Sequence, residues 1–131
     1  MDGFKRPILP LNLINPFDNF GFKWYGLVDS GADSCLFNKG ICDVTKHNLK
    51  ADGVKSVIST GISGKDIPTW QHTFVIQLLH PKTNISIWES PQSLINCVDH
   101  NEIPLLLGVT NFLKYFNITL DYSKEETILT W

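Results

Sequence analysis

An acidic residue follows an apolar pair in the stretch Leu27-Val28-Asp29-Ser30-Gly31-Ala32-Asp33. The apolar pair predicts the end of a strand, and the hydroxyl residue and glycine that follow the acid are typical of a tight turn. An isolated buried carboxylate is costly, so an acid in this position either caps the turn or takes part in chemistry. The choice between these two roles decides what the protein does.

Composition indicates a single globular domain over residues 1–131. A chain of 131 residues is long enough for one ordinary domain, and 43% hydrophobic with 18% charged residues fits a packed core. The formal net charge of -2, without long runs of Lys or Arg, gives no electrostatic footprint for nucleic acid or for a membrane surface. No stretch reaches the length of a membrane span, and the N-terminal residues do not read as a signal peptide.

The spacing of cysteines and histidines gives no sign of a metal, a cofactor or a disulfide scaffold, and we expect none. The sequence has three cysteines, Cys35, Cys42 and Cys97. Without a CxxC pair, they favour reduced thiols in a cytoplasmic protein, and the first is expected to be a small buried side chain. The sequence has four histidines, His47, His72, His80 and His100. They show no ligand spacing and are expected on the surface or in loops.

Short apolar stretches, separated by Gly, Pro, Asn and Asp, predict an all-β fold. One segment has helical periodicity instead, because Val109, Phe112, Leu113 and Phe116 fall at i, i+3, i+4 and i+7. This spacing predicts a short helix, whereas residues 41–50 fit either a short helix or an irregular loop. Strands are expected at Ile8–Ile14, Phe22–Val28, Val54–Thr60, Ile67–Leu79, Asn84–Trp88, Ser93–Val98, Ile118–Leu120 and Thr127–Trp131, and a short apolar segment at Cys35–Phe37.

A single carboxylate is a poor general base at neutral pH, because its ordinary pKa is about 4. Two carboxylates that share one proton overcome this, since repulsion raises one pKa and leaves one acid and one base. Only Asp29 has a suitable setting, because Asp99 and Asp121 lack a following Ser/Thr-Gly. The second carboxylate would then come from a second copy of the chain across a two-fold axis. The sequence therefore predicts a homodimer.

Residues 27–33 resemble the active-site motif of retropepsin-like aspartic proteases, which are short β-rich chains that dimerise to bring two catalytic aspartates together. Leu106-Leu107-Gly108, followed by the predicted helix, is similar to the second conserved loop of this family. Gly61-Ile62-Ser63-Gly64 stands where the family has its glycine-rich flap. The order of the three segments covers the chain from about Ile8 to Leu129, and the likeness is to cellular and bacterial members rather than to close viral ones. It implies a closed, folded-over β-barrel of the acid-protease type with one short C-terminal helix.

The resemblance also implies a role for each matching residue. Asp29 would be the catalytic acid of each subunit, Ser30 would hydrogen-bond across the dimer axis, and Gly31 would let the backbone approach the carboxylates. The residues expected to bind a peptide or protein substrate are Ala32, Asp33, Gly61, Ile62, Ser63 and Gly64. The implied activity is that of an aspartic endopeptidase, in which water held between two aspartates attacks a peptide bond.

The chain departs from the family pattern after the glycine of the second loop. Many members carry an Arg there that pairs with the acid at the Asp33 position, whereas this sequence has Val109-Thr110. Residues 38–53 match no part of the pattern. The terminal segments Lys5–Leu9 and Thr127–Trp131 could build a shared dimer sheet, as in the viral members.

Plainer interpretations of the same residues remain open. Asp-Ser-Gly can be an ordinary turn in which the polar side chains cap backbone groups, and Gly61–Gly64 can be an ordinary surface hairpin. At the level of function, the same fold could serve as a catalytically weak or inactive dimerisation or peptide-binding module.

Overall fold

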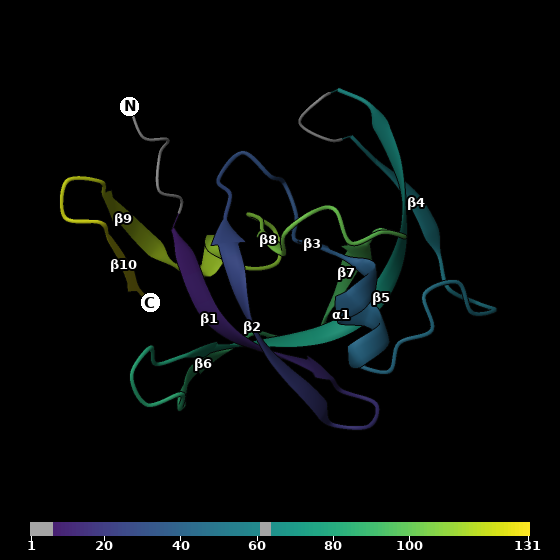
Figure 1. The fold of residues 1–131 in the computed structure, drawn as a ribbon, viewed down its shortest axis with the longest axis horizontal. Coiled ribbons are helices and arrows are strands. Elements are labelled where there is room, and N and C mark those ends of the chain that lie inside the picture. Colours follow the sequence, from purple (N-terminus) through teal and green to yellow (C-terminus); the bar gives the residue numbers. More distant parts are fainter. Residues whose placement is uncertain (1–6, 61–63) are drawn as a thin grey trace.

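The structure, a computed structural model, describes residues 7–60 and 64–131 and consists mostly of strands (Figure 1). Its main sheet contains, in spatial order, β1 (Ile8–Asn15), β2 (Phe20–Val28), β8 (Leu106–Leu107), β3 (Leu36–Phe37), β7 (Ser93–Cys97) and β5 (Asp66–Leu79). Because β5 also pairs with β1, these strands close into a ring. The prediction of a mostly β fold is confirmed.

Three smaller parts are attached to the ring. β4 (Ser56–Thr60) and β6 (Ser86–Glu89) both pair with β5, whereas β9 (Asn117–Asp121) and β10 (Glu126–Thr130) form a separate antiparallel hairpin. The β9–β10 hairpin lies on one side of the ring and the helix α1 (Lys39–Val44) on the other (Figure 1). Within residues 7–60 and 64–131, no helix has the length and apolar character that crossing a bilayer requires.

The β1–β2 hairpin is fixed by side chains in its turn. The Asn15 side chain accepts a hydrogen bond from the Phe17 amide at 3.1 Å, and the Asp18 carboxylate accepts one from the Phe20 amide at 3.0 Å. Asn19 has a φ of 57°, in the left-handed region that Asn tolerates better than most residues. This turn sets the register of the hairpin, in which Leu27 lies opposite Ile8. β2 ends at Val28, directly before Asp29.

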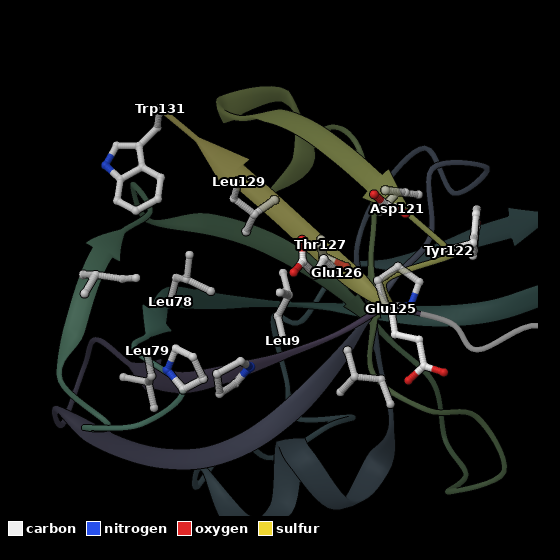
Figure 2. A pocket seen from close by; sticks show the side chains of 16 residues that line it. Leu9, Leu78, Leu79, Asp121, Tyr122, Glu125, Glu126, Thr127, Leu129 and Trp131 are labelled. Atoms are coloured by element: carbon white, nitrogen blue, oxygen red, sulfur yellow. The ribbon is translucent and has the colours of Figure 1, made fainter.

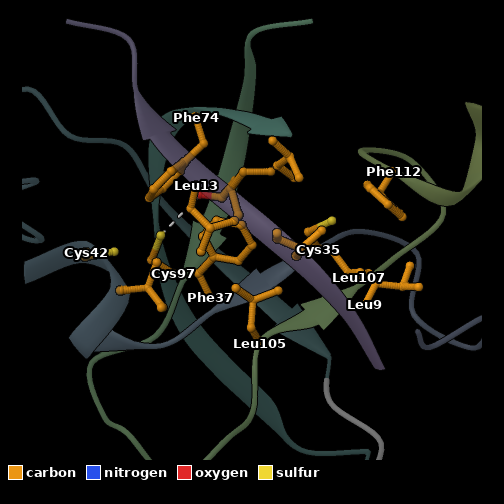
Figure 3. Close-up of a cluster of buried hydrophobic side chains, with 14 of the residues drawn as sticks. Leu9, Leu13, Cys35, Phe37, Cys42, Phe74, Cys97, Leu105, Leu107 and Phe112 are labelled. Atoms are coloured by element: carbon orange, nitrogen blue, oxygen red, sulfur yellow. Dashed lines mark hydrogen bonds between the residues drawn. The ribbon is translucent and has the colours of Figure 1, made fainter. Parts of the chain in front are cut away.

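The core fills the inside of the ring. Leu9, Leu11 and Leu13 alternate along β1 and point inward, as the two-residue period of a strand requires. They pack with the buried rings of Phe37 and Phe74, whose centroids lie 4.8 Å apart in an edge-to-face arrangement (Figure 3). Full burial of one such side chain stabilises the fold by roughly 1.5–3 kcal/mol.

The predicted C-terminal helix is wrong in type and extent, because the segment forms only a 3₁₀ turn, η1 (Leu113–Tyr115). The predicted apolar face is confirmed only in part, since Phe112 and Leu113 are buried and Phe116 is half-buried, whereas Val109 is exposed. The amides of residues 113 and 114 donate to carbonyls five residues back, and those of residues 115 and 116 to carbonyls three residues back, so the segment does not make the four-residue hydrogen bonds of an α-helix. The turn before η1 is wide, with the Leu113 amide donating to the Gly108 carbonyl at 3.0 Å.

The α-helix of the described chain is α1, which begins two residues before the region 41–50 that the sequence left open and overlaps its first part. Asn38 caps its N-terminus by accepting a hydrogen bond from the Ile41 amide at 3.0 Å, which satisfies one of the amides that a helix start leaves unpaired. The Asn38 amide group also donates to the Ile103 carbonyl at 3.1 Å, which ties the helix to the segment before β8.

Candidate active site

Asp29 stands immediately after β2, at the point where the parallel pairing of β2 with β8 ends. Leu27 and Val28 pair with Leu106 and Leu107, and the Asp29 amide donates to the Leu107 carbonyl at 3.1 Å. The two apolar pairs recognised in the sequence are therefore neighbours in space. Their pairing fixes where the acid leaves the sheet.

The residues after Asp29 form a tight turn around its own carboxylate. The Gly31 amide donates to Asp29 Oδ1 at 3.1 Å, and the Ala32 amide donates to the Asp29 carbonyl at 3.1 Å. Asp29 is half-buried, whereas Ser30 and Gly31 are exposed. Within the described ranges no hydrogen bond reaches Asp29 Oδ2, so one oxygen caps the turn while the other remains available for chemistry. The turn interpretation and the catalytic interpretation are thus compatible.

The loop at residues 29–35 is held by the segment that follows β8. The Val109 amide donates to the Ala32 carbonyl at 3.0 Å. The Asp33 carbonyl accepts two hydrogen bonds from Thr110, from the amide at 2.7 Å and from Oγ1 at 2.6 Å. Farther along, Asn111 Oδ1 accepts a hydrogen bond from the Cys35 amide at 3.0 Å. These contacts clamp the loop in the region where the family pattern has its Arg.

Gly108 is required by the close approach of these two segments. A Cβ at this position would lie 2.2 Å from the Ser34 carbonyl carbon and 2.3 Å from its oxygen, distances that no side chain can occupy. The Gly108 amide points at the Cys35 sulfur, 3.4 Å away. The spacing of the sequence does not reveal this contact, because the two residues are far apart in the chain.

Cys35 is fully buried beneath the loop, as expected for a small apolar side chain. Burial raises the pKa of its thiol to about 12, opposed in part by the hydrogen bond from the Gly108 amide. The thiol therefore stays protonated at neutral pH and is a poor nucleophile, because the thiolate is the reactive form. Cys35 is therefore not a candidate nucleophile at neutral pH.

The expected substrate-binding residues are only partly placed. Ala32 and Asp33 lie on the loop itself, and Asp33 is exposed. Gly61, Ile62 and Ser63 lie outside the described residues, so the structure gives no position for the predicted flap tip. Gly64 is exposed with a φ of 74°, in the left-handed region that favours glycine, and the flanking strands β4 and β5 pair as predicted.

The expectation that all histidines are surface or loop residues is wrong for His72, which is buried in β5; His47 lies in a loop after α1 but is buried too, with the two rings 5.1 Å apart. His47 Nε2 lies 2.9 Å from the Thr73 carbonyl oxygen, and Nδ1 lies 2.9 Å from Thr45 Oγ1. Burial lowers the pKa of His47, and the neighbouring His72 lowers it further, against the raising effect of the Thr73 carbonyl. Among the residues that the structure describes, no three His, Cys, Asp or Glu side chains are grouped as a metal ion would need.

A groove of about 730 Å³ opens in the described part of the chain, and its lining does not include Asp29. It lies between the start of β1 and the β9–β10 hairpin, and apolar side chains such as Leu9, Leu78 and Leu129 line it (Figure 2). β10 pairs only with β9 among the described strands, and Trp131 at the end of the chain is exposed.

Comparison with known proteins adds no relative to this picture. No protein-family model matches the chain. No curated protein matches it either. The assignment of function therefore depends on the motif and on the geometry around Asp29.

Proposed function

We propose that the chain is one subunit of a homodimeric, retropepsin-like aspartic endopeptidase with a folded-over acid-protease barrel. The observation that carries the proposal is Asp29, presented half-buried at the end of a strand with one carboxylate oxygen bound by its own turn. The clamp from residues 107–111 supports it further, because a catalytic carboxylate has to be held in a fixed position.

The dimer follows from the chemistry. With one Asp-Ser-Gly in each chain, two copies related by a two-fold axis supply two carboxylates, of which one stays protonated and the other ionised. Water between them passes a proton to the ionised carboxylate as its oxygen attacks the peptide carbonyl carbon. The protonated carboxyl gives its proton to the carbonyl oxygen. The tetrahedral intermediate then breaks its C–N bond: the carboxyl that took the proton from water gives it to the nitrogen, which leaves as the amine. The other carboxylate takes a proton from one hydroxyl of the intermediate as the acid product forms, which restores one protonated and one ionised carboxyl.

The direct test is cleavage of a peptide library between acidic and neutral pH, with Asp29→Asn as the inactive variant. Asp52→Asn is the matched control, because Asp52 is an exposed acid outside the loop. We expect the wild type and the control to cleave alike, and Asp29→Asn to lose turnover while its thermal unfolding is unchanged. Cleavage by Asp29→Asn at the wild-type rate would refute the proposal.

A mixing experiment tests whether the site is shared between two chains. When wild type and Asp29→Asn are mixed in equal amounts and allowed to exchange subunits, about a quarter of the dimers retain two intact carboxylates. Activity should therefore fall to about a quarter of that of undiluted wild type, and it should also fall on dilution as dimers dissociate. If the chain dimerises and binds peptides without cleaving any, the peptide-binding module is the correct function instead.

A further inference from the structure

Two side chains after Gly108 make contacts that the proposed reaction can use, although neither can form an ion pair. Thr110 is exposed and Asn111 half-buried, and both reach across to the loop that carries Asp29. We infer that Thr110 and Asn111 are positioning residues that hold the Asp29 loop in its working geometry, in place of the Arg that the sequence lacks. The inference rests on the proposed function for its effect on catalysis, while its structural part can be tested separately.

Thr110 fixes the loop through one carbonyl group. Its amide and its hydroxyl both donate to the Asp33 carbonyl oxygen, at 2.7 and 2.6 Å. A carbonyl oxygen has two lone pairs, so these two donors satisfy it fully. The orientation of the peptide plane after Asp33 is thereby set by a residue on the other segment. Because the Thr110 side chain is exposed, its hydroxyl contributes little to packing.

Asn111 fixes the end of the loop and connects it to β7. Its Oδ1 accepts from the Cys35 amide at 3.0 Å, and its Nδ2 donates to the Leu94 carbonyl at 3.4 Å. The amide group therefore bridges the loop and a strand of the ring. A hydrophobic side chain could make neither hydrogen bond. Asn111 is therefore needed for its polar amide group, although it stands next to the apolar residues Phe112 and Leu113.

The connection to the carboxylate runs through the turn. The Ala32 amide is bonded to the Asp29 carbonyl and the Gly31 amide to Asp29 Oδ1, each at 3.1 Å. A displacement at Asp33 is therefore passed to the carboxylate within four residues. A misplacement of about 1 Å at a reacting group can cost roughly 100-fold in rate. Because each carboxylate of the proposed dyad comes from one copy of this loop, a single substitution displaces both carboxylates.

The experiment compares Thr110→Val, Thr110→Ser, Asn111→Leu and Asn111→Asp with wild type. Val keeps the β-branched shape and loses only the hydroxyl, Ser retains the hydroxyl, Leu removes both amide contacts, and Asp keeps the acceptor for the Cys35 amide. Thr83→Val is the matched control, because the Thr83 hydroxyl accepts a backbone hydrogen bond in an exposed turn outside the loop. Amide hydrogen exchange of Gly31, Ala32 and Cys35 is measured together with kcat and KM.

We expect Thr110→Val to lower kcat about tenfold with a change in KM of less than about twofold, because the loss falls on the geometry of the transition state. The Gly31 and Ala32 amides, which do not contact Thr110, should exchange about tenfold faster. Loss of a hydroxyl that affected only its own hydrogen-bond partner would not change their exchange. Thr110→Ser should restore both, and Asn111→Asp should restore protection of the Cys35 amide that Asn111→Leu loses.

Unchanged exchange at Gly31 and Ala32 in Thr110→Val, with kcat within about twofold of wild type, would overturn the inference. If wild type cleaves no peptide, the proposed function fails. The exchange rates then decide alone whether these two side chains position the loop.

Discussion

Replacing Gly108 by alanine tests the contact on which the whole site geometry depends. The added Cβ would lie 2.2 Å from the Ser34 carbonyl carbon and 2.7 Å from its Cα, both backbone atoms that cannot rotate away. An ordinary contact begins near 3.4 Å, so the two segments have to separate by about 1.2 Å along this line. The separation stretches the hydrogen bonds that Val109 and Thr110 donate to the loop.

The expected cost follows from these distances. Forcing an extra methyl group into a packed site costs about 1–3 kcal/mol, and weakening hydrogen bonds to the loop adds about 1 kcal/mol for each. We expect Gly108→Ala to lose about 3 kcal/mol of unfolding free energy, equivalent to roughly 10 °C in Tm for a domain of this size. If the proposed function is correct, a shift of about 1 Å at Asp29 lowers kcat by roughly 100-fold in addition.

The assay is thermal and urea unfolding, with Gly40→Ala as the control for the same chemical change. Gly40 lies in α1, where an added Cβ meets only the Asn101 side chain at 3.0 Å and the Asn38 side chain at 3.4 Å. Alanine is favoured over glycine in helices by about 1 kcal/mol, so the control should be neutral or stabilised. A Gly108→Ala protein with the Tm of wild type would show that the two segments are not in contact, and the description of the clamp would be wrong.

Three further outcomes follow from the buried groups. Because burial lowers the pKa of His47, the unfolded chain binds more protons than the folded one below about pH 6.5, and stability should fall as pH drops from 7 toward 5. Urea unfolding at several pH values should show a shallower fall for His47→Gln, and equal slopes would contradict this assignment. Cys35, whose pKa is about 12, should resist alkylation at pH 8 until the protein is unfolded, as mass spectrometry of labelled samples can establish. Phe74→Ala should cost about 3–5 kcal/mol by urea unfolding, because the ring is fully buried at the centre of the core; a loss below about 1 kcal/mol would argue against that packing.

The sequence predicted the features that depend on local pattern. The apolar stretch Ile8–Ile14 indicated β1, and the acid after Leu27-Val28 indicated the end of β2. In each case the information lies within a few neighbouring residues, which is the range over which side-chain period and turn chemistry act. The pairing that brings Leu27-Val28 beside Leu106-Leu107 was not predicted.

The features that were missed depend on contacts between distant residues. The helical spacing after Gly108 was misleading because the amides of residues 113–116 donate to carbonyls five or three residues back rather than four, which leaves only a 3₁₀ turn. His47 and His72 can be buried because the backbone carbonyls of Thr73 and Leu49, respectively, accept their hydrogen bonds. These partners are distant in the sequence, so no local pattern predicts them. α1 is short and contains Gly40, so its cap at Asn38 was a weaker signal than a long apolar stripe.

The clamp around Asp29 also has a consequence for the order in which the protein can assemble. Thr110 and Asn111 follow their partners in the loop by 77 and 76 residues. Such non-local contacts form late and slowly in folding, because the chain has to close a long loop before they are gained. During synthesis from the N-terminus, Asp29 emerges before Thr110 and Asn111, and its loop lacks these contacts until they have followed it. A growing chain therefore carries the acid long before it carries a site, which keeps any activity confined to the finished fold.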